Sequence, residues 1–350
     1  MQVLQVGLVM CQQLQLAQAS SLLCQQNGGV DLKTAHQLYE RHEVNPLSYS
    51  EIEDFEDKLG LANAAILAGD EIFIAEITGL LSEAEIAFVD FRRAQLSNDF
   101  DSAQSQLKEC VESSRNSTSR NHFLEARARM EWGLLRFTQG QIDEAGIDLR
   151  WAMERLKVIS EGSAEHGLAI INMAAWHLSR NESIMALSQL SQIDRLGPHK
   201  IEIIAASRLQ IAKILFEIGD YKSSQRHAWV AFQGFRSCSM IGGAIEAALI
   251  WLDLSINKVS KSATLMSEIV ENASPRNLGD NNECSSHPDD VELVIEWCTD
   301  YWEVDFSGPN RPDLMVMLEA ENSVGLKMFS GKLTEETNIE DLEVLKMLNQ

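Results

Sequence analysis

Residues Trp132 to Ala145 read WGLLRFTQGQIDEA. The stretch starts with apolar residues at helical spacing, passes through the turn Gly140-Gln141-Ile142, and reaches Ala145 five positions after Gly140. A glycine ends a helix readily, and a small residue early in the next helix lets two helices cross closely. The stretch therefore predicts a pair of helices joined by a tight turn.

The same turn pattern recurs along the chain with a period near 40 residues. The anchors are Asn98-Asp99-Phe100, Gly140-Gln141-Ile142, Asn181-Glu182-Ser183, Gly219-Asp220-Tyr221 and a weaker fifth near Lys258. Five positions after each anchor stand Ala103, Ala145, Ala186, Ser224 and, in the weak fifth, Ala263. Seven positions before the anchor stand Gly133, Ala174 and Ala212, with Phe91 as the exception. The pattern predicts four helix pairs and a weaker fifth between about residues 82 and 273.

The repeat resembles the tetratricopeptide family, whose unit is a helix-turn-helix with small residues at the crossing. Residues 132–145, followed by Ala152, are the nearest match, and Ile218-Gly219-Asp220-Tyr221 with Ala231 comes second. The family's usual unit is about 34 residues, so the longer period here indicates its long-helix members. The resemblance implies an all-α fold, a right-handed α-solenoid of helix hairpins. Its motifs indicate the fold and say little about the function.

In this family the first helix of each pair lines a concave groove, and the resemblance carries ten groove positions onto this chain. They are Arg127, Met130, Leu134, Phe137, Leu168, Ile171, Leu178, Leu209, Lys213 and Phe216. We expect the apolar members to bury an amphipathic helix of a partner protein, and Arg127, Arg136 and Lys213 to orient it. Other occupants of the groove are the chain's own N-terminal helix, its C-terminal segment or a second copy. Alternatively, a tight superhelix buries these residues against neighbouring repeats.

The two ends of the chain differ from the repeats. Residues 1–80 are expected to form an N-terminal helical cap region, with a helix over Leu32 to Glu43, a break at Asn45-Pro46, and a further helix capped by Ser48 or Ser50. Residues 81–273 hold the repeats, and residues 274–290 have the composition of a linker or loop. Residues 291–350 form an acidic C-terminal module. It is either a small mixed α/β unit with a hairpin over residues 314–329 or a final helical cap.

The charge balance excludes one class of partner. The chain has 29 Lys and Arg against 52 Asp and Glu, a net charge of −23. Nucleic-acid binding depends on neutralising phosphates with Lys and Arg, so no nucleic-acid partner is expected. The acidic surface serves solubility, or else it attracts a basic segment of a partner protein.

The N-terminus and the cysteines bear on location. Glutamines interrupt the apolar stretch from Met1 to Leu23, and the first positive residue is Lys33, so neither a secretory signal nor a membrane span is predicted. The six cysteines show no paired spacing, which favours a reducing, cytoplasmic setting.

Catalytic motifs are missing from the sequence, and no enzyme activity or cofactor is predicted. No Gly-x-Ser-x-Gly elbow, phosphate loop or His-Glu-x-x-His pattern occurs. Cys284, His287 and Cys298 lack a fourth ligand at a recognisable spacing, so no metal is expected. We therefore predict a non-catalytic intracellular scaffold or adaptor that binds a protein or peptide segment. The alternative is a regulatory sensor solenoid that binds a peptide or small molecule. The partner and the oligomeric state stay open.

Overall fold

The computed structural model describes residues 32–116, 120–255, 260, 262–272 and 284–304. Within these ranges the regular secondary structure is entirely helical, which confirms the all-α class. The chain divides into two compact units, unit 1 over Met1–Lys200 and unit 2 over Ile201–Gln350. The first part of the N-terminal cap region, residues 1–31, lies outside the described residues, as do the turn near Lys258 and the hairpin expected over residues 314–329.

The described part of unit 1 begins with four short helices. They are α2 (Leu32–Val44), α3 (Tyr49–Asp54), α4 (Lys58–Ala68) and α5 (Glu71–Thr78). The helix expected over Leu32 to Glu43 is confirmed, and Ser48 caps α3 in a capping box with Glu51. The single helix expected after Ser48 is two helices. Asp57 starts the second one, because its side chain accepts a hydrogen bond from the backbone nitrogen of Gly60 at 2.8 Å.

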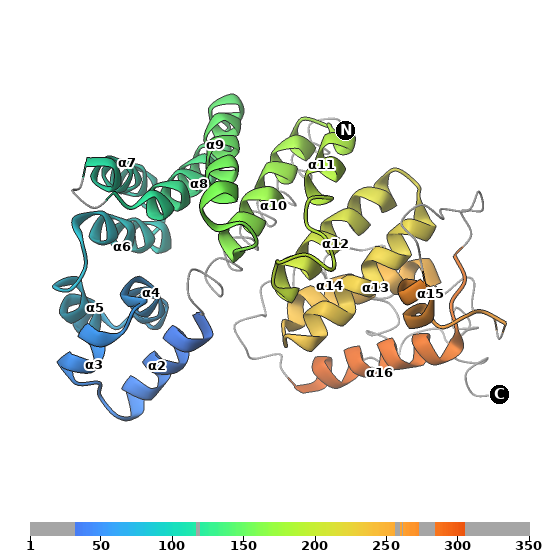
Figure 1. The fold of residues 1–350 in the computed structure, drawn as a ribbon. Helices are drawn as coiled ribbons and strands as arrows, with labels where there is room; N and C mark the ends of the chain where they lie inside the picture. The colour runs from blue at the N-terminus through green and yellow to red at the C-terminus, as the bar shows by residue number, and fades with distance from the viewer. Residues whose placement is uncertain (1–31, 117–119, 256–259, 261, 273–283, 305–350) are drawn as a thin grey trace. The chain divides into compact units, whose positions relative to one another are not determined.

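Four helix pairs follow, as the repeat predicted, and in each pair the two helices pack against one another (Figure 1). Unit 1 holds α6 (Glu83–Leu96) with α7 (Phe100–Asn116), α8 (His122–Thr138) with α9 (Ile142–Ser160), and α10 (Ala164–Ser179) with α11 (Ser183–Leu190). Unit 2 begins with α12 (Ile201–Glu217) and α13 (Tyr221–Ser237). The second helix of the third pair is short, and the irregular segment 191–200 follows it.

The turn inside each pair depends on a residue in the left-handed region. Asn98, Gly140, Asn181 and Gly219 have φ angles of 56°, 77°, 60° and 85°. Glycine adopts this conformation without steric cost, and asparagine tolerates it better than most residues. The Gly or Asn that opens each anchor is therefore the residue that lets the chain reverse direction.

Small residues lie where the helices of a pair cross. A Cβ atom added to Gly133 would stand 2.9 Å from the Cγ atom of Leu149, so only glycine fits between α8 and α9. In the fourth pair the Ser224 hydroxyl donates a hydrogen bond to the backbone oxygen of Ala212 at 2.8 Å, and both residues are buried. These contacts confirm the predicted crossing positions in both pairs.

The expected fifth pair is not formed as the repeat predicted. Unit 2 continues with α14 (Ile241–Ser255), α15 (Met266–Asn272) and α16 (Pro288–Val304). Ala263 precedes α15 and therefore lies outside any second helix. The expected linker over residues 274–290 is also too long at its C-terminal end. Helix α16 begins at Pro288. Proline suits the first helical turn, and the acidic Asp289 and Asp290 interact favourably with the positive, N-terminal end of the helix dipole.

Helix α16 belongs to the core of unit 2. It packs against α14, and its Trp297 ring meets the Phe232 ring of α13 edge to face, with centroids 5.2 Å apart. The Gln225 side-chain amide also donates to the hydroxyls of Ser255 and Ser286 at 2.9 and 2.7 Å. The described start of the C-terminal module is thus a helix fixed to the fourth repeat.

Candidate functional site

Most of the ten groove residues predicted from the sequence are buried within the chain. The buried ones are Arg127, Met130, Leu134, Phe137, Leu168, Ile171 and Leu209. An apolar side chain held in this way contacts its own chain, which is the alternative that the sequence left open. These six apolar residues are therefore not accessible to a partner in this structure.

The other three groove residues keep exposed surface but differ in their contacts. Leu178 is half-buried, and Phe216 is 40% exposed and packs edge to face on Tyr221. Lys213 forms an ion pair with Glu246 of α14. Arg136, expected to orient a partner, likewise pairs with Asp148 of α9. The two charged side chains are thus engaged within the chain.

Arg127 lines a pocket within unit 1. Helix α4 contributes Asn63, Ile66 and Leu67, and helix α6 contributes Arg92, Gln95 and Leu96. These residues line a space that is partly open to solvent. Its rim is apolar, since Leu67 and Leu96 are 46% and 51% exposed.

The first arginine of the pocket is neutralised within the chain. Arg92 donates to the Glu131 carboxylate at 2.8 Å and to the Gln95 side-chain oxygen at 2.8 Å. Arg92 and Glu131 are both almost fully buried. Two buried charges at this distance compensate one another, so the pair adds little net charge to the pocket.

The second arginine is not neutralised in this way. Arg127 is only 4% exposed, yet its guanidinium forms no hydrogen bond or ion pair with another residue in the described ranges. Its support is the Phe88 ring, whose centroid lies 4.8 Å from the guanidinium carbon. A buried cation that lacks a hydrogen-bonded partner is costly to the fold. Arg127 therefore marks this pocket as the candidate site.

Comparisons with protein-family models, curated proteins and solved structures gave no match to this chain. The site therefore has to be interpreted from its own geometry. Within the described residues no helix is long and apolar enough to cross a membrane.

Asp57 is the titratable group whose negative charge partly offsets the positive charge of Arg127. Burial raises the pKa of the Asp57 carboxyl to about 6, while its hydrogen bond from Gly60 and the nearby charge of Arg127 act in the opposite direction. The Oδ2 atom of the Asp57 carboxylate has no hydrogen-bond partner among the described residues. The two groups thus interact through space, and neither holds the other in a fixed hydrogen bond.

Sequence reasoning found Arg127 but missed Arg92, Gln95 and Asn63. The available signal was the pair Arg92 and Glu131, which are opposite charges 39 residues apart, close to one repeat period. Such a spacing places two residues on the first helices of successive pairs. No comparable spacing signal in the sequence marks the pocket residues of α4, because α4 precedes the repeats.

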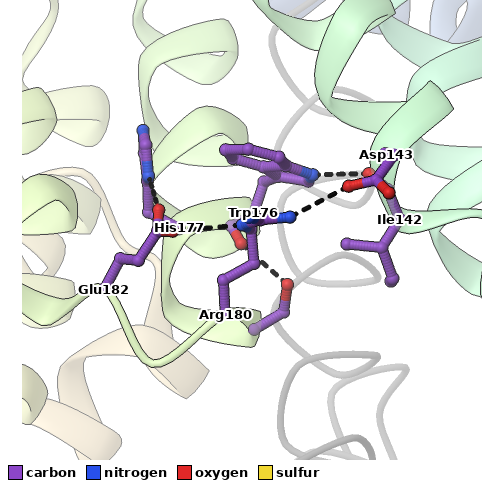
Figure 2. Close-up of polar contacts among 7 residues, drawn as sticks. Ile142, Asp143, Trp176, His177, Arg180 and Glu182 are labelled. Atoms are coloured by element: carbon purple, nitrogen blue, oxygen red, sulfur yellow. Dashed lines mark hydrogen bonds and ion pairs between the residues drawn. The ribbon is translucent and has the colours of Figure 1, made fainter.

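A second polar cluster joins α9, α10 and α11 (Figure 2). The indole nitrogen of Trp176 donates to the backbone oxygen of Ile142 at 2.6 Å. Arg180 reaches Asp143 at 2.9 Å and Glu182 at 3.1 Å, and Glu182 also contacts the His177 ring at 2.7 Å. The Trp176 ring lies so close to Gly146 that an added Cβ would stand 2.4 Å from it. This cluster locks the third repeat onto the second.

A buried histidine pair closes the C-terminal end of unit 1. His199, on the irregular segment 191–200, stacks on His166 of α10 with ring centroids 5.3 Å apart. Burial lowers the pKa of His166 to about 4, with a smaller contribution from His199, and burial lowers the pKa of His199 as well. Both rings are therefore neutral near pH 7.

We expect this pair to make unit 1 less stable in mild acid. The unfolded chain takes up a proton at His166 near pH 6.5, whereas the folded chain resists it down to about pH 4. The contribution to stability is complete above pH 6.5 and is lost as the pH falls from 6.5 towards 4. Between pH 7 and 5 the free energy of unfolding should fall by about 1–2 kcal/mol from this residue.

The measurement is the free energy of unfolding at pH 7 and pH 5 for the natural chain and for His166→Phe. Phenylalanine keeps the stacked ring and removes the titrating group. The difference between the two pH values should shrink in the variant. An unchanged difference would contradict the assignment of the acid sensitivity to His166.

Proposed function

We propose that this chain is a non-catalytic helical-repeat adaptor that binds a segment of a partner protein. In this proposal its helix pairs stack as a right-handed, tetratricopeptide-like solenoid and work in the cytoplasm. Support for the solenoid comes from the repeated left-handed turns and from the small residues at the helix crossings. The free, buried thiols of Cys110 and Cys298 fit a reducing setting.

The observation that carries the binding function is the pocket of unit 1. Its rim leucines are about half exposed, and its Arg127 guanidinium is buried without a hydrogen-bonded partner. Exposed apolar surface beside a charge without a hydrogen-bonded partner suits an interface with an apolar contact and a polar anchor. The proposed contact surface is therefore this pocket and its rim.

The pocket replaces the apolar anchors expected from the repeat. Met130, Leu134 and Ile171 are buried within the chain, so a partner would contact other residues. Leu67 and Leu96 become the apolar contacts in their place. Both line the pocket that Arg127 enters from α8.

A rim variant tests this function. Leu67→Glu with Leu96→Glu should abolish capture of the partner from native lysate, because two charges would then occupy the apolar rim. Both positions are exposed, so the fold should survive, which circular dichroism would check. The matched control is Ile147→Glu with Val158→Glu, which adds the same charge at exposed positions of α9.

The readout is quantitative mass spectrometry of the captured proteins. A partner retained by the natural chain and by the α9 control, and lost by the rim variant, supports the proposal. Equal capture by all three proteins would overturn the pocket as the binding surface.

A further inference from the structure

Two arginines line the same pocket, but only one of them, Arg92, forms an ion pair with a carboxylate of the described chain. Arg92 has a carboxylate partner at 2.8 Å, whereas the Arg127 guanidinium has no hydrogen-bonded partner among the described residues. Arg127 thus leaves one positive charge at the floor of the pocket. Five N–H donors on a guanidinium suit a carboxylate or another oxyanion.

Around Arg127 the pocket offers further polar groups and an apolar edge. The Gln95 side-chain oxygen accepts a hydrogen bond from Arg92, which leaves the amide NH₂ group of Gln95 able to donate. Asn63 lines the same space, and its side-chain oxygen has no hydrogen-bond partner. Leu67 and Leu96 flank these groups with exposed apolar surface.

We propose that this pocket binds the acidic side chain of a partner segment, with Arg127 pairing with its carboxylate and Leu67 and Leu96 contacting apolar residues on either side of it. This inference rests on the proposed adaptor function and names the chemistry that the partner must present. An acidic partner segment differs from the basic segment that the net acidic charge of the chain would attract. At contact distance the positive charge of the pocket selects the segment that binds. The net negative charge of the chain acts over a longer range and is screened by salt.

A single negative charge fits the pocket better than a phosphate dianion. Arg127 is the one uncompensated cation that the lining supplies, since Glu131 already neutralises Arg92. The carboxylate of Asp57, which caps α4, interacts with Arg127 through space and would oppose a second negative charge. Glu85 and Glu165 are the other acidic groups that interact with Asp57.

The test uses two blocked peptides, acetyl-Ala-Leu-Glu-Leu-Ala-amide and the same peptide with Gln in place of Glu. The full chain, labelled with nitrogen-15, is titrated with each peptide at constant ionic strength. Shifts of the arginine side-chain Nε–Hε signals report binding, and the Arg127→Met variant assigns the signal. We expect the Glu peptide to shift the Arg127 signal and to bind at least about tenfold more tightly than the Gln peptide.

Two variants separate binding from folding. Arg127→Met keeps the length of the side chain and removes the unpaired buried charge. It should therefore lose the preference for Glu while its melting temperature stays equal or rises. Asp57→Asn keeps a side-chain oxygen that caps α4 and removes a negative charge beside Arg127. This variant should bind the Glu peptide at least about threefold more tightly.

The inference is overturned if the two peptides bind equally, or if Arg127→Met lowers the melting temperature and leaves peptide binding unchanged. Hexanoate is titrated as a third ligand, because it carries a carboxylate on an apolar chain but has no peptide backbone. Hexanoate binding as tightly as the Glu peptide would assign the site to a small molecule and contradict a partner segment. If the rim variant loses its captured partner but the Glu peptide does not bind, the adaptor function stands and this inference alone fails.

Discussion

Arg92→Met should lower the free energy of unfolding of unit 1 by about 3–5 kcal/mol. The substitution removes one partner of a buried ion pair and leaves the Glu131 carboxylate, whose side chain is 1% exposed, without its cation. Desolvation of an uncompensated charge is the main cost, and the lost hydrogen bond to Gln95 adds to it. Urea unfolding followed by hydrogen exchange in peptides from α6 and α8 would measure the effect in unit 1 alone.

The neighbouring residue provides the matched control. Arg93 pairs with Glu71 and Asp90, but its side chain is 44% exposed, so Arg93→Met should cost less than about 1 kcal/mol. Arg92→Met combined with Glu131→Leu should recover part of the stability, since neither charge is then left buried alone. Equal effects of the two single substitutions would refute the argument from burial.

Trp176→Ala should destabilise unit 1 by about 3–5 kcal/mol. Trp176 is 7% exposed, fills the space beside Gly146, and donates a hydrogen bond to the backbone oxygen of Ile142. Alanine would leave a cavity between α9 and α10 and would remove the hydrogen bond from the indole nitrogen to the Ile142 oxygen. Trp151→Ala, at a partly exposed position of α9, should cost clearly less.

A second substitution tests the geometry of this contact. Gly146→Leu should be strongly destabilising in the natural chain, because the Trp176 ring occupies the space that any side chain would need. In the Trp176→Ala background the same change should be milder, since the leucine then fills part of the cavity. Additive effects in the unfolding measurement would show that the two residues do not compete for this space.

The sequence was sufficient to predict the helix pairs because each pair depends on local chemistry. A left-handed turn accepts few residue types, so Asn98, Gly140, Asn181 and Gly219 were visible as anchors. Close helix crossings admit only small side chains, which made Gly133 and Ser224 visible as well. The expected fifth pair is the exception, because in the structure Ala263 precedes α15 and does not lie within a second helix.

The site could be predicted only in part, because burial and pairing depend on tertiary contacts. Arg92 and Arg93 are neighbours of the same type, yet one is buried against Glu131 and the other lies at the surface. Hydrophobic periodicity places Met130 and Leu134 on one helix face but does not say how closely the next helix covers them. The contribution of Asn63 required α4, which lies outside the repeat that guided the prediction.

The pairing of neighbouring helices also affects how the chain folds during synthesis. Helix α6 packs mainly on α7, α8 on α9, and α12 on α13, so the principal contacts of each pair form between segments adjacent in the sequence. Chains with such local contacts have little loop entropy to overcome and fold quickly. Each hairpin can therefore fold soon after it leaves the ribosome, and unit 1 can pack before the residues of unit 2 are translated.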